Sequence, residues 1–232
     1  MLLFLCLLGT LFFPGTLLPQ PLVISLGSDC QVTAEIREAK LREAAFPFDW
    51  VVTEDFESVI QALEDDFKHW LDPAYLEYKN NQILNTYYGI SFVHDFPIIG
   101  SPHMSDEADH TGFGLIDPNF LNYLSPAAEK FKRRFDRLSA ALNSNHPIIF
   151  IRANASPSSA RHFVSMMKQK YPTLPFTLVV VSPSKLLNFD WNIEGVRNFY
   201  ALDPSGSYSW WWGPKTWQMV FKELSLFLGV PR

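Results

Sequence analysis

Cysteine is scarce in this sequence, and several other features that direct a search for function are missing. Only Cys6 and Cys30 occur among 232 residues, which is too few for the disulfide framework of a small secreted scaffold. There is no internal repeat and no low-complexity linker, which excludes solenoids and repeat arrays. The formal net charge is -5, so we expect neither nucleic acid nor an anionic membrane surface as a partner.

The amino terminus carries no charge. No charged side chain precedes Asp29, and residues 2–18 are almost wholly apolar. A basic start and a small-residue cleavage site are both missing, and Pro14 and Gly15 interrupt the segment before it is long enough to span a bilayer. Three interpretations stay open, in which residues 1–20 are an export signal, a membrane anchor, or a misassigned start or buried core segment. The first two predict an exported or membrane-associated protein, and a misassigned start predicts a cytoplasmic one.

The remaining chain is rich in core-forming residues. With 47% hydrophobic and 15% aromatic residues, residues 21–232 are expected to form a single catalytic-type domain. The clearest signal is a strand–helix–strand unit, in which apolar runs at 148–151 and 176–181 flank an amphipathic helix at 157–171. Because such a crossover joins parallel strands, we expect an α/β fold with a mostly parallel, Rossmann-like sheet flanked by helices. The other expected elements are strands at 22–26 and 196–202, helices at 31–43, 54–70, 127–142 and 216–228, and an irregular stretch at 75–122 with one extended piece.

Cys30 follows the first expected strand and a glycine turn, at the start of a helix. The N–H groups at a helix start favour a thiolate and can form an oxyanion hole, whereas the neighbouring Asp29 carboxylate opposes a second negative charge. The pattern therefore predicts a nucleophile at Cys30, with Gly27, Ser28 and Asp29 at the substrate. The alternative is that Cys30 is a small buried hydrophobic residue.

A nucleophilic thiol needs a base, and His94 has the most strongly structured setting of the six histidines. It interrupts an extended apolar segment, and the alternative is a core histidine that bonds a carbonyl group. Asp49, in an aromatic cluster, and Asp203, at the end of a strand, are both able to orient the imidazole. Asp95 is badly placed to reach the ring of its own neighbour. The sequence leaves the choice between Asp49 and Asp203 open.

Ligands of a parallel sheet collect at the carboxyl ends of its strands. Gly27, Arg152, Ser182 and Asp203 should converge there. An arginine directly after an apolar strand is costly to bury unless it meets a carboxylate or an anionic ligand. Arg152 is therefore predicted either to pair with Asp49 or Asp203, or to bind the substrate.

Three further patterns favour structure over chemistry. Two histidines and nearby carboxylates at 103–110 suit a solvated loop, and we expect no metal and no cofactor. The basic run at 130–137 surrounds an apolar stripe and predicts a solvated helix face. Aromatic residues at 208–217 either line a cleft or cover a sheet edge. A serine hydrolase is disfavoured because no histidine follows His162.

Five short motifs, taken in order from Val23 to Asp203, resemble a known family. They are Ser25–Cys30, Leu41–Arg42 with Phe46–Trp50, His94–Phe96, Arg133–Phe135 with Arg137, and Phe150–Arg152. Their order and spacing are similar to those of the bacterial domain family of unknown function described as "putative papain-like cysteine peptidases". The resemblance implies a thiol nucleophile at Cys30 and a catalytic histidine at His94. It also implies, as the alternative fold, a papain-like α+β arrangement with the cysteine helix on an antiparallel sheet.

We therefore expect a thiol-dependent hydrolase or acyl transferase acting on a peptide, an ester or a glycan, with Cys30 as nucleophile and His94 moving the proton. A second hypothesis is an α/β transferase for a glycan or nucleotide-linked donor, with Arg152 and the Gly27 turn holding phosphate. A third is a catalytically silent interaction domain of the cell envelope. The first needs an acidic thiol near an imidazole, the second needs a phosphate-sized basic cleft, and the third needs neither.

Overall fold

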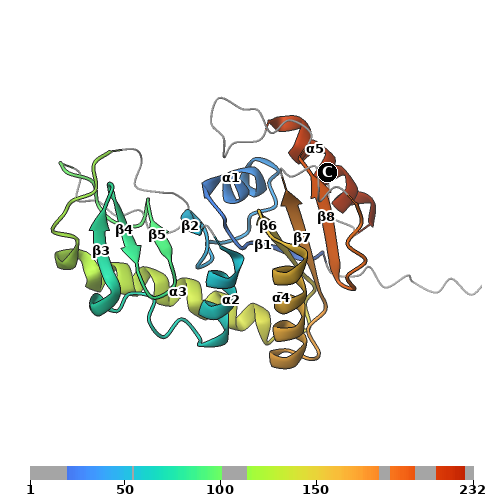
Figure 1. Cartoon of the computed structure of the whole chain (residues 1–232), viewed down its shortest axis with the longest axis horizontal. Helices are drawn as coiled ribbons and strands as arrows, with labels where there is room; N and C mark the ends of the chain where they lie inside the picture. The colour runs from blue at the N-terminus through green and yellow to red at the C-terminus, as the bar shows by residue number, and fades with distance from the viewer. Residues whose placement is uncertain (1–19, 54, 101–113, 183–188, 202–212, 228–232) are drawn as a thin grey trace, which may run out of the picture.

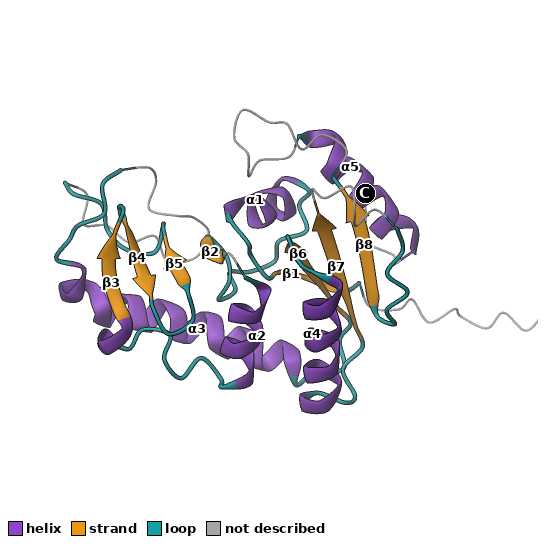
Figure 2. Cartoon of the chain, viewed as in Figure 1, coloured by secondary structure: helices purple, strands orange, loops and turns teal. Residues whose placement is uncertain are grey.

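The computed structural model describes residues 20–53, 55–100, 114–182, 189–201 and 213–227. It contains two four-stranded sheets, one parallel and one antiparallel (Figures 1 and 2). The strands of the parallel sheet, in spatial order, are β1 (Leu22–Ser25), β6 (Ile148–Ala153), β7 (Phe176–Ser182) and β8 (Val196–Tyr200). The predicted α/β fold with a parallel sheet is confirmed.

Helices cover both faces of the parallel sheet because its strands present apolar side chains alternately to each face. Ile149 and Ile151 share a buried cluster with residues of α1 (Cys30–Glu38) and α5 (Pro214–Phe227). Ile148 and Phe150 point the other way, toward α2 (Phe56–Glu64) and α4 (Pro157–Lys170) (Figure 1). This burial on two sides explains the uninterrupted apolar runs of β6 and β7.

The antiparallel sheet lies in the long connection between β1 and β6. Its strands, in spatial order, are β2 (Val51–Thr53), β5 (Ile90–Phe92), β4 (Gln82–Asn85) and β3 (Leu76–Lys79). The sequence predicted that residues 75–122 are irregular with one extended piece. This expectation was wrong for β3, β4 and β5, which form three strands of the sheet. Asn80 and Asn81, with φ of 50° and 60°, form the two-residue turn between β3 and β4, as in tight hairpins that need positive φ at both turn positions.

Helix α3 (Leu124–Leu142) runs along the antiparallel sheet toward the parallel one (Figure 1). Two short 3-10 helices, η1 (Pro73–Tyr75) and η2 (Phe120–Tyr123), precede it. The Phe131 ring of α3 lies 5.5 Å from the rings of both Trp70 and Phe92, measured between centroids. One cluster of buried residues contains Phe92 of the antiparallel sheet and Phe150 of the parallel sheet. The two sheets therefore share a core.

Two helices end earlier than the apolar spacing predicted. Helix α1 stops before Lys40, which has φ of 59°, and α2 stops before Asp66 and Phe67, with φ of 55° and 61°. Left-handed residues end a right-handed helix. Trp70 nevertheless stays buried, because the chain turns back onto the same core.

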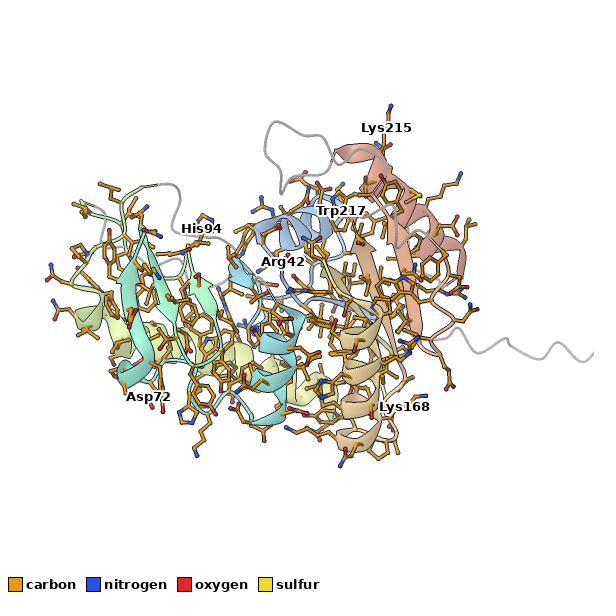
Figure 3. The ribbon with its side chains drawn as sticks, in the orientation of Figure 1. Arg42, Asp72, His94, Lys168, Lys215 and Trp217 are labelled. Atoms are coloured by element: carbon orange, nitrogen blue, oxygen red, sulfur yellow. The ribbon has the colours of Figure 1, made fainter. Side chains whose placement is uncertain are left out.

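Several sequence predictions fall outside the described residues. These include the terminal segment 1–19, the 103–110 cluster, Asp203 and the aromatic run 208–212. Trp217 is described: it belongs to α5, and its buried side chain packs against the parallel sheet, which it helps to cover (Figure 3). Over the described ranges, no helix combines the length and the apolar character needed to cross a bilayer.

Candidate active site

The candidate site is built around the turn that joins β1 to α1. Gly27 and Ser28 have φ of 71° and 90°, a conformation that costs energy for a serine. Asp29 caps the helix, accepting a hydrogen bond from the Gln31 amide through Oδ1 at 2.9 Å. Cys30 is the first residue of α1, and it is a free, half-buried cysteine. Strained backbone of this kind concentrates at functional sites.

Arg152 and Thr53 hold the turn. Arg152 is fully buried, and its Nη1 donates to the Leu26 carbonyl at 3.0 Å and to Thr53 Oγ1. Its Nη2 donates to the Thr53 carbonyl at 2.9 Å. Two backbone amides complete the link. The Ser28 amide donates to Thr53 Oγ1 at 3.3 Å, and the Thr53 amide donates to the Ser28 carbonyl at 2.8 Å. Burial lowers the pKa of Arg152 to about 9, while the charges of Asp29 and Asp55 oppose that shift.

The direction of the Arg152 side chain follows from its position in β6. It points to the same face as Phe150, and its guanidinium lies 5.2 Å from the centre of the Phe56 ring. The hydrogen bonds of Arg152 within the described structure go to backbone and hydroxyl oxygens, so the predicted pairing with Asp49 was wrong. The binding of substrate by Arg152 stays a prediction, and so does the binding of substrate by Gly27.

The chain at the end of β6 meets the turn, and the end of β7 contacts that chain. Asn154, which has φ of 55°, donates from Nδ2 to Ser28 Oγ at 3.4 Å and from its amide to the Val181 carbonyl at 2.9 Å. Ser182 is buried at the end of β7. The carboxyl edge of the parallel sheet therefore supports the backbone that carries Cys30.

The pKa of the Cys30 thiol is raised to about 12, mainly by burial and further by the charges of Asp29 and Asp95, against a smaller lowering by the Cys30 amide. Burial also raises the pKa of Asp29, although the Gln31 amide and Arg152 lower it. The raised thiol pKa is opposite in direction to the effect expected from a helix start. A thiol of this kind is protonated at neutral pH, so it needs a base that removes its proton as the sulfur attacks.

His94 follows β5 and is 9% exposed. Its ring stands edge-on to Trp50 with 6.4 Å between centroids, and the Arg37 guanidinium of α1 lies 5.2 Å from the centre of the same Trp50 ring. Trp50 has φ of 64°, which is a strained conformation for so large a residue. Figure 3 shows His94 between the antiparallel sheet and α1. The effect of the Asp95 charge on Cys30 also brings the His94 segment within electrostatic reach of the thiol.

Asp49, one of the two predicted orienting acids, is 2% exposed and ion-paired. Its Oδ2 accepts from Arg42 Nη2 at 2.9 Å and from the Phe46 amide at 3.1 Å, and its Oδ1 accepts from the Thr33 hydroxyl at 3.3 Å. Burial raises the pKa of Asp49, while Arg42 and Arg134 lower it. These contacts fix the chain before β2 against α1. The part of Asp49 in orienting His94 stays a prediction, and Asp203 lies outside the described residues.

Sequence reasoning missed a buried ion cluster next to His94, formed by Asp95, Lys130 and Arg134. The expectation of a solvated helix face was wrong for Lys130 and Arg134, which are 3% and 1% exposed. Lys130 Nζ lies 2.8 Å from Asp95 Oδ1 and donates to the Asp95 carbonyl at 3.0 Å, and Arg134 Nη1 donates to the same Oδ1 at 3.1 Å. The available signal was the four-residue spacing of two cations beside the apolar stripe of α3.

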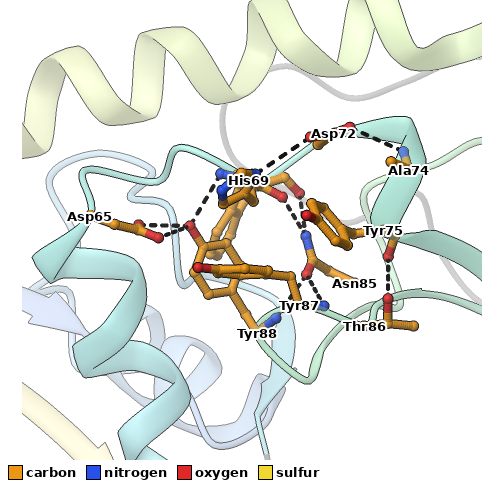
Figure 4. A network of polar contacts seen from close by, with 10 residues as sticks. Asp65, His69, Asp72, Ala74, Tyr75, Asn85, Thr86, Tyr87 and Tyr88 are labelled. Atoms are coloured by element: carbon orange, nitrogen blue, oxygen red, sulfur yellow. Dashed lines mark hydrogen bonds and ion pairs between the residues drawn. The ribbon is translucent and has the colours of Figure 1, made fainter.

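Two other histidines have partners elsewhere. His69 lies 3.4 Å from Asp72 and donates its backbone amide to the Tyr88 hydroxyl in a polar network that braces the antiparallel sheet (Figure 4). His162 pairs with Glu57 on the surface. Within the part of the chain that is described, no group of three or more histidine, cysteine or acidic residues is placed to hold a metal ion.

Comparison with known proteins agrees with the motif resemblance. A family model for a domain of unknown function, described as "Putative papain-like cysteine peptidase", matches residues 21–185, a span that contains Cys30, His94 and Arg152. An uncharacterized protein of Acanthamoeba polyphaga mimivirus, R408, is 26% identical over 212 residues, covering 78% of this chain and 87% of that protein. This relative is viral, so the expected bacterial occurrence stays a prediction. No solved structure matches the chain.

Proposed function

This chain belongs to the family described as "Putative papain-like cysteine peptidase", and from that premise we propose that it cleaves or transfers acyl groups through a covalent intermediate on Cys30. The observation that carries the proposal is the position of Cys30. This half-buried free cysteine is the first residue of a helix, directly after a strained turn that two sheets hold in place. Fixed placement of this kind is what a nucleophile requires.

In the first step, the Cys30 sulfur attacks the carbonyl carbon of the substrate. A carbon–sulfur bond forms, the carbonyl electron pair moves to oxygen, and His94 accepts the thiol proton as the sulfur attacks. The raised pKa of Cys30 favours this concerted route over a preformed thiolate. Backbone N–H groups at the start of α1 are the donors suited to the developing oxyanion.

In the second step, the tetrahedral intermediate collapses to a thioester. The bond to the leaving amine or alcohol breaks, and the leaving group takes the proton from His94. Water, or a second nucleophile in a transfer reaction, then attacks the thioester while His94 accepts its proton. The carbon–sulfur bond breaks, and His94 returns that proton to the Cys30 sulfur, which leaves as the thiol. Each cycle returns both side chains to their starting protonation states.

A transferase that holds phosphate with Arg152 receives less support. Arg152 is fully buried, and its two terminal nitrogens already donate to Leu26 and Thr53. Arg152 Nε has no partner among the described residues, but an anion could reach it only if the buried turn opened. The thiol chemistry needs no such change.

The proposal is tested with the full-length chain on a mixture of peptides that covers all residue types, with new termini detected by mass spectrometry. Cys30→Ala and His94→Asn should each abolish cleavage, whereas His162→Asn, at an exposed histidine, should leave it at the parent level. A parallel assay with simple esters separates ester from peptide preference. Cleavage that survives in Cys30→Ala, or a parent with neither peptide nor ester cleavage, would overturn the proposal.

A further inference from the structure

Asp95 is firmly anchored in the candidate site, although its position next to His94 in the sequence argued against a role. Two cations of α3 bind it. Lys130 contacts both its carboxylate, at 2.8 Å, and its backbone carbonyl, at 3.0 Å, and Arg134 contacts the carboxylate at 3.1 Å. All three side chains are at most 3% exposed. The residue that follows His94 is thus fixed at both its main chain and its side chain.

The Asp95 carboxylate also has an unused oxygen. Both cations bind Oδ1, whereas Oδ2 is buried without a hydrogen-bond partner among the described residues. A buried oxygen without a partner is costly, so its retention calls for an explanation. The negative charge of Asp95 reaches the thiol of Cys30, where it disfavours the thiolate. The same charge favours a cation on a neighbouring imidazole.

We propose that Asp95 is the positioning residue of the Cys30–His94 pair, fixing the backbone of His94 and favouring the imidazolium that forms when Cys30 gives up its proton. This inference rests on the proposed function, and it gives the orienting charge to a residue other than Asp49 or Asp203. Lys130 and Arg134 hold the buried carboxylate in place and compensate its charge. The arrangement keeps the thiol protonated at rest and eases proton transfer only as the sulfur attacks.

A purely structural role for the cluster predicts different behaviour. Loosening the cluster at any member would then expose Cys30 and raise its reactivity toward a small alkylating agent. The electrostatic role depends instead on which charge is removed. Asp95→Asn removes the charge that disfavours the thiolate, and Lys130→Met keeps that charge while weakening the anchor.

The test measures the rate of Cys30 alkylation by iodoacetamide near pH 8 in the full-length chain, with peptide mapping to separate Cys30 from Cys6. We expect Asp95→Asn to react about tenfold faster than the parent, the equivalent of one pKa unit, and Lys130→Met to react no faster. Lys132→Met is the matched control, because Lys132 lies on the same helix and pairs with Asp136 at 2.6 Å but is 74% exposed. Its rate should equal that of the parent.

Turnover gives the second readout. In Asp95→Asn, kcat should fall at least tenfold with KM little changed, although the thiol has become more reactive. Faster alkylation in both Asp95→Asn and Lys130→Met, or an unchanged kcat in Asp95→Asn, would overturn the inference. If Asp95→Asn fails to fold, Asp95→Glu is used in its place, because the longer side chain displaces the carboxylate. A folded Asp95→Glu variant with the kcat of the parent would then also overturn the inference. Loss of turnover in Cys30→Ala alongside normal turnover in Asp95→Asn would reject the inference and leave the proposed function standing.

Discussion

Arg152 donates a hydrogen bond to the backbone carbonyl of Thr53 at 2.9 Å, which ties an inner strand of the parallel sheet to the last residue of β2 in the antiparallel sheet. The same guanidinium bonds the Leu26 carbonyl just before the Gly27 turn. The segment that presents Cys30 is therefore held by residues far away in the sequence. Its geometry depends on both sheets being in place.

Replacement of this arginine should destabilise the whole chain. Arg152→Met leaves buried oxygens of Leu26 and Thr53 without donors, and we expect the free energy of unfolding to fall by about 3 kcal/mol. Urea denaturation measures the change. Arg161→Met, at an exposed arginine of α4, should change the free energy by less than about 0.5 kcal/mol. Equal effects of the two substitutions would show that the buried contacts contribute little.

Removal of the Asp29 charge should make Cys30 more acidic. Asp29→Asn keeps a side-chain oxygen able to cap α1 and removes a carboxylate that raises the thiol pKa. We expect faster alkylation of Cys30 near pH 8, by roughly three- to tenfold, because one pKa unit corresponds to about a tenfold change in thiolate.

Asp55→Asn is the matched control for that experiment. Asp55 caps α2 through the same contact, with Oδ1 accepting from the Glu57 amide at 3.0 Å, and it is not among the charges that shift Cys30. Its alkylation rate should match that of the parent. A rate increase in Asp55→Asn as large as in Asp29→Asn would argue for loosened structure instead of charge.

The parallel half of the fold was predictable because its signals are local. Residues 148–181 alternate strand, helix and strand with unbroken apolar runs, and the crossover rule then fixes parallel pairing. The antiparallel sheet was harder, since β3 exposes most of its side chains and β2 and β5 have three residues each. The Asn80–Asn81 turn was its one strong local signal.

The site was predictable only where a residue follows a strand or starts a helix. Cys30 and the Gly27 turn could be placed in that way. The partners of Asp95 could not, because Lys130 and Arg134 lie 35 and 39 residues further along the chain and meet it only through tertiary packing. For the same reason, the sequence suggested a carboxylate partner for Arg152, where the structure has backbone and hydroxyl oxygens.

The contact between α2 and α4 should depend on pH. His162 Nδ1 lies 2.6 Å from Glu57, and this hydrogen bond, with the charges of Glu57 and Glu64, raises the pKa of His162. A histidine whose pKa is higher in the folded than in the unfolded state stabilises the fold. The stabilisation is complete at a pH below the pKa of the unfolded state, about 6.5, and it is lost as the pH rises through the pKa of the folded state.

The measurement compares the free energies of unfolding of the parent and His162→Gln. Because the pair is about half exposed, with 48% and 45% exposure, we expect the parent to be more stable by only about 0.5 kcal/mol near pH 5.5. The difference should vanish near pH 8.5 and in about 1 M salt. A difference that grows with pH would contradict this assignment.

The most direct test of the account is acylation of the protein by p-nitrophenyl acetate, with the released p-nitrophenol followed over time and the modified residue located by peptide mass mapping. The account predicts a burst of up to one equivalent of p-nitrophenol per chain, acetyl on Cys30, and a rate at least about 100-fold lower in His94→Asn. Acetyl found elsewhere, or a His94→Asn variant that is acylated at the parent rate, would contradict a Cys30–His94 acyl-transfer site.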